Sequence, residues 1–281
     1  MKFIPKKVDA DVNLPDSHPL HDMAWMTAGL AILLVVFYLL SGVIVDQLAK
    51  FIPPEFDNSV DINLDQELTE LFGPAISNDP FVEDTRRIFQ KLRERLPEDD
   101  TRSYTLTILD SDEVNAMALP GGRIVVLRGL LEQAESENEV AMVLAHEFGH
   151  TYNRHHWRKL GRTILFGVMA GILGNSQSTL NNQLANLSLA TMTQTNSRSH
   201  EKESDRFALE LLCRTYGHSG GATDFFERNM SKQGLGAKSI AFLLTHPLSQ
   251  KRVDAIQAQA ADSGCLVDET KPWPHTAGST T

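Results

Sequence analysis

The sequence predicts an α+β fold, in which one transmembrane helix precedes a mainly helical domain that contains a small antiparallel sheet. Three observations lead to this prediction. Residues 24–45 are apolar and carry no charged side chain. Residues 104–127 contain three short apolar segments separated by turn residues, which is typical of strands. Helix-capping residues or apolar side chains at helical spacing mark several further segments.

The composition indicates a globular protein rather than a nucleic-acid-binding one. The chain has 281 residues, of which 42% are hydrophobic, and a formal net charge of −10. This length allows one large domain or two small ones. An acidic chain lacks the basic face of nucleic-acid-binding proteins, so no nucleic-acid partner is expected. Cys213 and Cys265 can pair in an oxidising compartment, but we expect both to be free.

Residues 24–45, AWMTAGLAILLVVFYLLSGVIV, are predicted to be an uncleaved membrane anchor. A bilayer core of about 30 Å needs about 20 apolar residues of helix, and this run is long enough. A cleaved signal peptide is the alternative, but its apolar region is shorter and no clean cleavage site follows. Three lysines precede the run, and Lys50 is alone after it until Arg86. This bias places residues 1–23 in the cytoplasm and the large C-terminal part across the membrane.

The segments after the anchor are read in order. Residues 46–79 are acidic and loop-like, which predicts a linker. Residues 80–96 carry apolar side chains at helical spacing, and the initial proline suits a first turn. Three strand candidates then follow with turn residues between them, so we expect a small meander. These candidates are residues 104–109, 114–119 and 124–127.

Two longer helices are predicted in the second half of the chain. Ser136 and Glu139 form an S-x-x-E capping box, so a helix should begin there and continue through the sequence VLAHEFGHTYNRHH. Another helix is expected from Ser197 until Gly217 ends it.

Three segments are less regular. Residues 164–173 are apolar but too short to span a bilayer, which favours a buried or membrane-grazing segment. Residues 180–196 are polar and low in charge, which predicts a flexible loop or a marginal helix, and the segment 175–196 could gate the site. Residues 262–281 have the composition of a loose tail.

A metal site is predicted within VLAHEFGH. His146 and His150 are four residues apart on a helix, so both imidazoles leave the same face and can meet one zinc ion. Glu147 lies beside them and can act as a general base without being a ligand. This is the H-E-x-x-H arrangement of zinc peptidases. The alternative is a pair of ordinary surface histidines.

A catalytic zinc needs a third protein ligand, and two residues compete for this role. His156 follows His146 at the metzincin spacing, with Asn153 where that pattern has glycine. Glu201 is the other candidate, and Asp205 shares its helix face. One carboxylate can then bind zinc while the other orients a ligating histidine.

These residues carry a family resemblance. HEFGH followed by RH, and SRSHEKESD at residues 197–205, resemble the HtpX and CAAX-prenyl-protease type family of membrane-linked zinc metallopeptidases, which includes mitochondrial OMA-type and bacterial periplasmic members. The second motif of that family is S-R-x-x-E-x-E-A-D, and Ser204 replaces its alanine. Residues 115–131 and 245–253 are also similar. The resemblance covers about residues 80–260 and implies a peptidase domain at 80–261.

The resemblance also implies roles for individual residues. It implies a zincin-like fold with one zinc ion per chain, Glu201 as third ligand and Asp205 as the orienting carboxylate. His155 and His156 then lie on a continuing helix without a role, and Glu203 is solvated. The implied protein is a single-pass inner-membrane endopeptidase that acts on polypeptides in the periplasm and removes damaged or unassembled proteins.

The predicted reaction is hydrolysis of a peptide bond with Glu147 as general base and then acid. The oxyanion needs a further donor, and His246 or Arg252 could face the zinc. His246 could instead occupy the open metal position in a resting state, or both could form a structural His-Pro turn with a salt bridge. The segment 114–119 could be an edge strand that pairs with substrate through Asn115 and Ala116, or could only pack the core.

Two rival functions remain open. One is a zinc-containing chaperone or assembly factor with little proteolysis, against which the intact HEFGH argues. The other is an enzyme that processes prenylated proteins, which usually needs several strong membrane spans. The residues do not specify the substrate, the cleavage preference or the oligomeric state.

Overall fold

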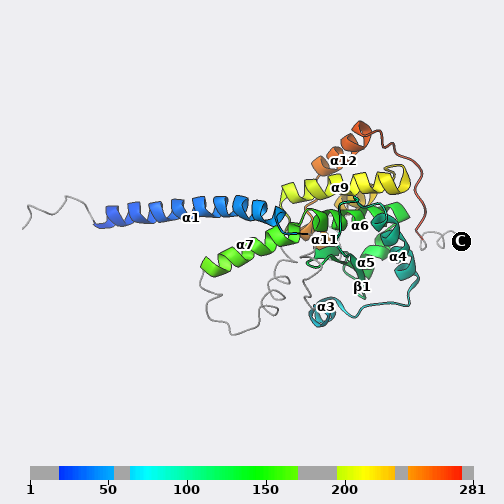
Figure 1. The fold of residues 1–281 in the computed structure, drawn as a ribbon, viewed down its shortest axis with the longest axis horizontal. Coiled ribbons are helices and arrows are strands. Elements are labelled where there is room, and N and C mark those ends of the chain that lie inside the picture. Colours follow the sequence, from blue (N-terminus) through cyan, green and yellow to red (C-terminus); the bar gives the residue numbers. More distant parts are fainter. Residues whose placement is uncertain (1–18, 54–63, 170–194, 232–239, 274–281) are drawn as a thin grey trace, which may run out of the picture. The chain divides into compact units, whose positions relative to one another are not determined.

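The computed structural model describes residues 19–53, 64–169, 195–231 and 240–273 (Figure 1). The chain divides into two compact units between Ile44 and Val45. Helix α1, Pro19–Lys50, begins in the first unit and is, by length and composition, the one candidate membrane span among the described residues. Most of its apolar side chains are exposed, as expected for a surface that faces lipid.

The second unit consists of helices around a small sheet. Its core runs from α4 through α6 and α9 to α12, and a smaller apolar cluster covers the other face of the sheet. The elements are α3 Asp65–Phe72, α4 Pro80–Arg93, β1 Thr105–Leu109, β2 Ala116–Leu119, β3 Arg123–Leu127, α5 Arg128–Gln133, α6 Glu137–Tyr152, α7 His155–Met169, α9 Arg198–Tyr216, α10 Asp224–Ser231, α11 Ile240–Thr245 and α12 Gln250–Asp262.

The predicted α+β class with a small sheet is confirmed, but the sheet is mixed rather than an antiparallel meander. Its strand order is β1-β3-β2, with β1 parallel and β2 antiparallel to β3. The tight turn Pro120-Gly121-Gly122 can join only antiparallel neighbours, so it explains the β2–β3 hairpin. The continuous apolar run of β3 suits a central strand buried on both faces. Val125, Val126 and Leu127 are accordingly all buried.

Helices α6 and α9 lie against each other and form the centre of the unit (Figure 1). The side chain of Ser136 caps α6 by accepting a hydrogen bond from the backbone N–H of Glu139, as the capping box predicts. A Cβ atom at Gly149 would lie only 3.0 Å from the backbone of Ser204. The glycine therefore permits the close approach that brings the two motif-bearing helices together.

Helix α6 ends earlier than predicted. Asn153 is its C-terminal cap, Arg154 has a φ of 58°, and a new helix, α7, begins at His155. The prediction of one continuing helix is therefore wrong. The left-handed residue is Arg154 rather than Asn153, and the Arg154 side chain donates a hydrogen bond to the carbonyl of Ala49. This break changes the direction of the chain directly after the histidine motif.

Two segments predicted to be loose are ordered parts of the fold. Residues 64–79, in the predicted linker, include α3, and Leu64 and Leu68 are buried in the smaller cluster. In the predicted tail, Trp273 is 1% exposed, and its indole N–H donates to the carbonyl of Leu131. Short apolar anchors inside polar sequence explain both errors. Residues 170–194, with most of the possible gate, lie outside the described residues.

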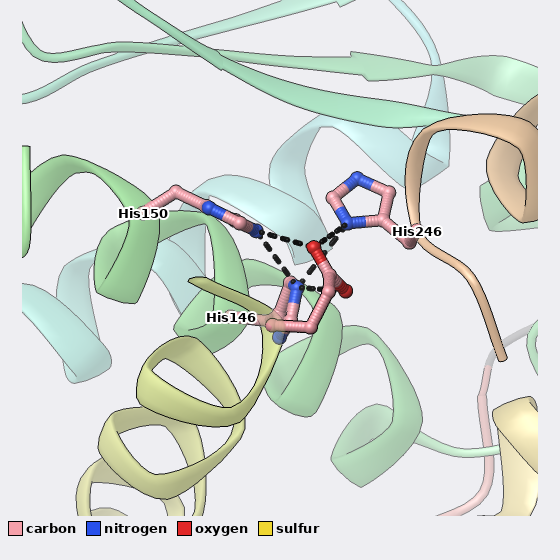
Figure 2. Close-up of side chains that lie close together, drawn as sticks. His146, His150 and His246 are labelled. Carbon is pink, nitrogen blue, oxygen red and sulfur yellow. Dashed lines mark hydrogen bonds and ion pairs between the residues drawn. The ribbon is translucent and has the colours of Figure 1, made fainter. Parts of the chain in front are cut away.

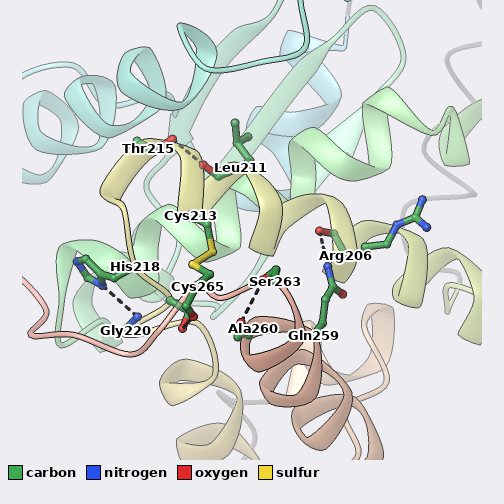
Figure 3. Close-up of a disulfide and its surroundings, with 11 residues drawn as sticks. Arg206, Leu211, Cys213, Thr215, His218, Gly220, Gln259, Ala260, Ser263 and Cys265 are labelled. Atoms are coloured by element: carbon green, nitrogen blue, oxygen red, sulfur yellow. Dashed lines mark hydrogen bonds between the residues drawn. A yellow bond between two sulfur atoms is a disulfide. The ribbon is translucent and has the colours of Figure 1, made fainter.

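Cys213 on α9 and Cys265 after α12 form a disulfide (Figure 3). Their Cα atoms are 6.1 Å apart, within the range that a disulfide spans. The prediction of two free cysteines is therefore wrong. The residues are 52 positions apart, and only the packing of the segment after α12 against α9 brings them together.

Replacement of both cysteines by serine should lower the free energy of unfolding of the second unit by about 2–4 kcal/mol, because the unfolded chain gains loop entropy. Thermal unfolding of the full chain in detergent micelles, followed by circular dichroism, measures the change. Reduction of the unaltered chain should give the same shift. An unchanged midpoint in both experiments would contradict a structural role of this bond.

Candidate metal centre

Helix α6 places the predicted H-E-x-x-H residues in the interior. His146, Glu147 and His150 are all buried, and the rings of the two histidines lie edge to face with centroids 4.6 Å apart. Helix α9 brings Glu201 to the same point. Its carboxylate oxygens lie 3.4 Å from Nε2 of His146 and 3.4 Å from Nε2 of His150. The sequence prediction thus named three residues that the structure brings together.

His246, directly after α11, completes a group of four donors (Figure 2). Its Nδ1 lies 3.3 Å from Nε2 of His146 and 3.3 Å from Oε1 of Glu201. The two Nε2 atoms of His146 and His150 are 3.0 Å apart. Ligands about 2.0–2.1 Å from a tetrahedral zinc are about 3.3 Å from one another. The group therefore has the size of a four-coordinate metal site.

Asp205 and Arg252 contact the side chains of the four-donor group. Oδ1 of Asp205 lies 3.0 Å from Nδ1 of His146, the position predicted for an orienting carboxylate. Arg252 donates hydrogen bonds from Nε and Nη2 to both oxygens of Asp205, at 2.8 and 2.6 Å. Its Nη1 lies 2.6 Å from Glu201 and donates to the carbonyl of Pro247. Arg252 is thus bound to the carboxylates rather than aimed at a substrate.

Burial and charge shift the proton affinities of this group. Burial opposes protonation of His146, but Glu201 and Asp205 outweigh it and raise the pKa of His146 to about 10. Burial also opposes ionisation of Glu201, yet the charges of His246 and His146 hold its pKa well below the usual range. The group thus favours an ionised carboxylate beside buried imidazoles, and this charge balance suits a cation.

Glu147 differs from Glu201 in its surroundings. Burial raises the pKa of Glu147. Its Oε1 lies 3.5 Å from Nε2 of His246, an ion-pair distance, and has no hydrogen-bond partner among the described residues. A buried carboxylate whose oxygen makes no hydrogen bond can exchange a proton with a molecule in the adjoining pocket.

A pocket opens beside Glu147, and the edge strand β2 forms one side of it. The backbone N–H of Leu127 donates to the carbonyl of Asn115, so strand alternation turns the polar groups of Ala116 and Ala118 away from β3. The N–H of Ala116 donates to the side chain of Asn115. Asn115 thus does not offer its own carbonyl to the pocket, contrary to the prediction, whereas Ala116 and Ala118 lie on the edge of β2 that pairs with no other strand in the described part of the chain.

Sequence reasoning missed several residues at this site. Asn196 is buried, and its Nδ2 lies 3.3 Å from Nδ1 of His246. Lys159 on α7 also lines the pocket, and burial lowers its pKa to about 8. His156, the rival third ligand, is buried beside the pocket but outside the four-donor group.

Two further predictions were wrong. His155 was predicted to have no role, but its Nδ1 lies 2.8 Å from Nδ1 of His150. Glu203 is not simply solvated, because its Oε2 lies 3.2 Å from Nε2 of His155 and 3.1 Å from Nη1 of Arg158. Both contacts are made by the first turn of α7, which begins directly after the left-handed residue Arg154.

The profile of Peptidase family M48 matches residues 83–260, more than half of the chain. The chain belongs to peptidase family M48. M48 peptidases use a metal, and the buried group of two histidines, Glu201 and His246 fits one by donor type, burial and spacing. The predicted family and metallopeptidase class are therefore confirmed.

Curated relatives share the match over part of their length. The chain is 32% identical over 159 residues to the mitochondrial metalloendopeptidase OMA1 of Schizosaccharomyces pombe. It is 28% identical over 212 residues to a putative beta-barrel assembly-enhancing protease of Vibrio cholerae, and 26% identical over 156 residues to the beta-barrel assembly-enhancing protease of Escherichia coli. These alignments cover 55%, 68% and 52% of this chain, but 46%, 43% and 32% of the relatives.

Proposed function

We propose that this M48 chain is a membrane-anchored zinc endopeptidase with Glu147 as its catalytic base. One observation carries the proposal: four buried donor atoms within 4.8 Å of one another adjoin a pocket that is lined by Glu147 and by the edge strand β2. His146, His150 and Glu201 would hold the zinc. Two imidazoles and one carboxylate are the ligand set of a catalytic zinc that keeps a position open.

The chain's own residues would carry the proton transfers. When bound, zinc polarises the scissile carbonyl and lowers the pKa of water. Glu147 accepts the proton of the attacking water and returns it to the leaving amide nitrogen. Asp205 orients His146 through Nδ1, and Arg252 holds Asp205 and Glu201 in place. No covalent intermediate with the enzyme is required.

The open edge of β2 would bind the substrate backbone. The carbonyl of Ala116 and both backbone groups of Ala118 lie on the side of β2 opposite β3, by strand alternation. An extended polypeptide can pair with such an edge through main-chain hydrogen bonds. This mode of binding selects for extended, unfolded segments rather than for particular side chains.

His246 would occupy the fourth metal position in a resting state. Its Nδ1 lies as close to His146 and Glu201 as a fourth tetrahedral ligand would. Water and substrate need that position, so His246 has to withdraw before hydrolysis.

His246→Ala should therefore raise the basal hydrolysis of an unfolded protein several-fold without loss of zinc. Steady-state cleavage of a fluorescent casein by the full chain, together with metal analysis, measures both effects. His218→Ala, outside the site, is the control. A fall in kcat of His246→Ala would instead assign His246 to the stabilisation of the oxyanion.

The proposed location is the bacterial inner membrane, with α1 as a single span and the peptidase unit in the periplasm. The lysines that precede the apolar run support this orientation. The Cys213–Cys265 disulfide supports it independently, because structural disulfides persist in oxidising compartments. Its relatives, named as a mitochondrial metalloendopeptidase and as beta-barrel assembly-enhancing proteases, suit a role in the removal of damaged or unassembled proteins.

Metal analysis and digestion of an unfolded protein test the proposal together. The purified full chain in detergent micelles should contain about one zinc per chain and cleave reduced, unfolded casein. A chelator should stop cleavage, and added zinc should restore it. A metal-free chain that cleaves casein, or a zinc-loaded chain that suppresses aggregation without cleavage, would refute the endopeptidase and favour the chaperone alternative.

A further inference from the structure

The two histidines of the H-E-x-x-H motif are supported in different ways. His146 contacts a carboxylate, that of Asp205, through Nδ1. His150 has no carboxylate at its Nδ1 among the described contacts, and His155 lies there instead, with an Nδ1-to-Nδ1 distance of 2.8 Å. Both histidines direct Nε2 toward the four-donor group. The second motif histidine therefore depends on another imidazole for its orientation.

Metal binding would determine the positions of the protons along this contact. If His150 held the metal through Nε2, its Nδ1 would carry the proton. That N–H can donate only to a nitrogen with a lone pair, so Nδ1 of His155 accepts and its Nε2 carries the proton. The Nε2 proton then points at Oε2 of Glu203, 3.2 Å away. Each nitrogen and oxygen in this series of hydrogen bonds thus acts either as a donor or as an acceptor.

The surroundings of His155 hold its ring in this orientation. Arg158, one turn later on α7, donates to the same oxygen of Glu203 at 3.1 Å. The ring of His200 stacks on that of His155, with centroids 4.2 Å apart and an interplanar angle of 12°. Ser204 approaches Nδ1 of His155 at 3.2 Å, which is a longer contact than that of His150. His155 is 1% exposed, so water does not replace these partners easily.

We propose that His155, held by Glu203, is a positioning residue that fixes the tautomer and the ring orientation of the metal ligand His150. This inference rests on the proposed zinc function. It assigns a role to the imidazole that follows the helix break at Arg154. Partners that orient metal ligands typically contribute 10–100-fold to metal affinity or activity.

Two matched substitutions separate this role from simple packing. His155→Phe keeps an aromatic ring in the cluster but removes the acceptor for His150. His200→Phe makes the same change in the stacked neighbour, whose ring nitrogens have no hydrogen-bond partner among the described residues. His155→Asn retains an acceptor oxygen near the position of Nδ1. Glu203→Leu removes the anchor of His155 while leaving its ring.

The readout is the zinc dissociation constant of the purified full chain in detergent micelles, measured by competition with a chelator. The visible absorption spectrum of the cobalt-substituted chain is a second readout, because it reports the ligand geometry. His155→Phe should weaken zinc binding by about 10–100-fold and alter the spectrum. His155→Asn should recover most of the affinity, Glu203→Leu should lose affinity in the same direction, and His200→Phe should remain within about threefold of the unaltered chain.

Each outcome decides the inference without depending on cleavage. Equal zinc affinity of His155→Phe and the unaltered chain would overturn it while leaving the endopeptidase proposal intact. Equal losses in His155→Phe and His200→Phe would also overturn it, because packing alone would then explain the effect. If the unaltered chain binds no divalent metal, the zinc proposal itself fails.

Discussion

Glu147→Gln should retain zinc but lose at least about 10²–10⁴-fold in kcat on an unfolded protein substrate, because general base catalysis contributes that much. The side chain is 1% exposed and borders the pocket, and its Oε1 has no hydrogen-bond partner among the described residues. An amide of the same shape cannot accept the proton of the attacking water. The proposed ligands His146, His150 and Glu201 are unchanged, so metal content and the unfolding temperature should stay near those of the unaltered chain.

Glu94→Gln is the matched control for this prediction. Glu94 is exposed at the C-terminal end of α4 and does not line the pocket, so its substitution should leave kcat within error. Steady-state kinetics with zinc analysis on both variants gives the comparison. A Glu147→Gln protein that still cleaves casein at the unaltered rate would remove Glu147 from the mechanism. Retained suppression of aggregation without any cleavage, in variant and unaltered chain alike, would favour a chaperone.

The first half of the site could be predicted because it lies within one turn of helix. Spacing of four residues places His146 and His150 on one face without any knowledge of the tertiary fold. Glu201 was predicted from its resemblance to a second motif, because geometry alone left His156 as a rival. The similarity of residues 245–253 to the family made His246 a candidate for the metal position, but left its role open. His246 is 100 residues from His146, and its place in the group depends on how α11 packs.

The errors share one physical origin, which is that long-range packing overrides local signals. Arg154 adopts a left-handed conformation without glycine or proline, so nothing in the sequence predicted the helix break. The parallel neighbour β1 was unpredictable from strand patterns, because alternation does not specify the direction of pairing. The described part of the predicted tail is held by the disulfide of Cys265 and by the buried indole of Trp273. A few apolar residues can therefore hold a polar segment against the core, although the composition of the segment predicts a loop.

Arg252→Met should destabilise the metal-free chain by about 3–5 kcal/mol, which is the usual loss when one partner of a buried ion pair is removed. Arg252 is largely buried, binds both oxygens of Asp205, and lies 2.6 Å from Oε2 of Glu201. Methionine fills the stem of the side chain but leaves two buried carboxylates without their cation. For a unit of this size the loss corresponds to a fall of roughly 6–20 °C in unfolding midpoint.

Bound zinc should reduce this loss, because it neutralises Glu201 even when Arg252 is absent. Thermal unfolding in micelles is therefore measured for the unaltered chain and for Arg252→Met, each with and without chelator. The fall in midpoint caused by the substitution should be smaller when zinc is bound. The unfolding midpoint of Arg252→Lys should lie between those of the unaltered chain and Arg252→Met, since an ammonium keeps the charge but not the bidentate contact with Asp205. Arg206→Met, on the exposed face of α9, should change the midpoint little. If the midpoint of Arg252→Met fell equally in the presence and absence of zinc, Arg252 and the metal would not share the charge of Glu201, and the carboxylate pair would have to be neutralised by another group.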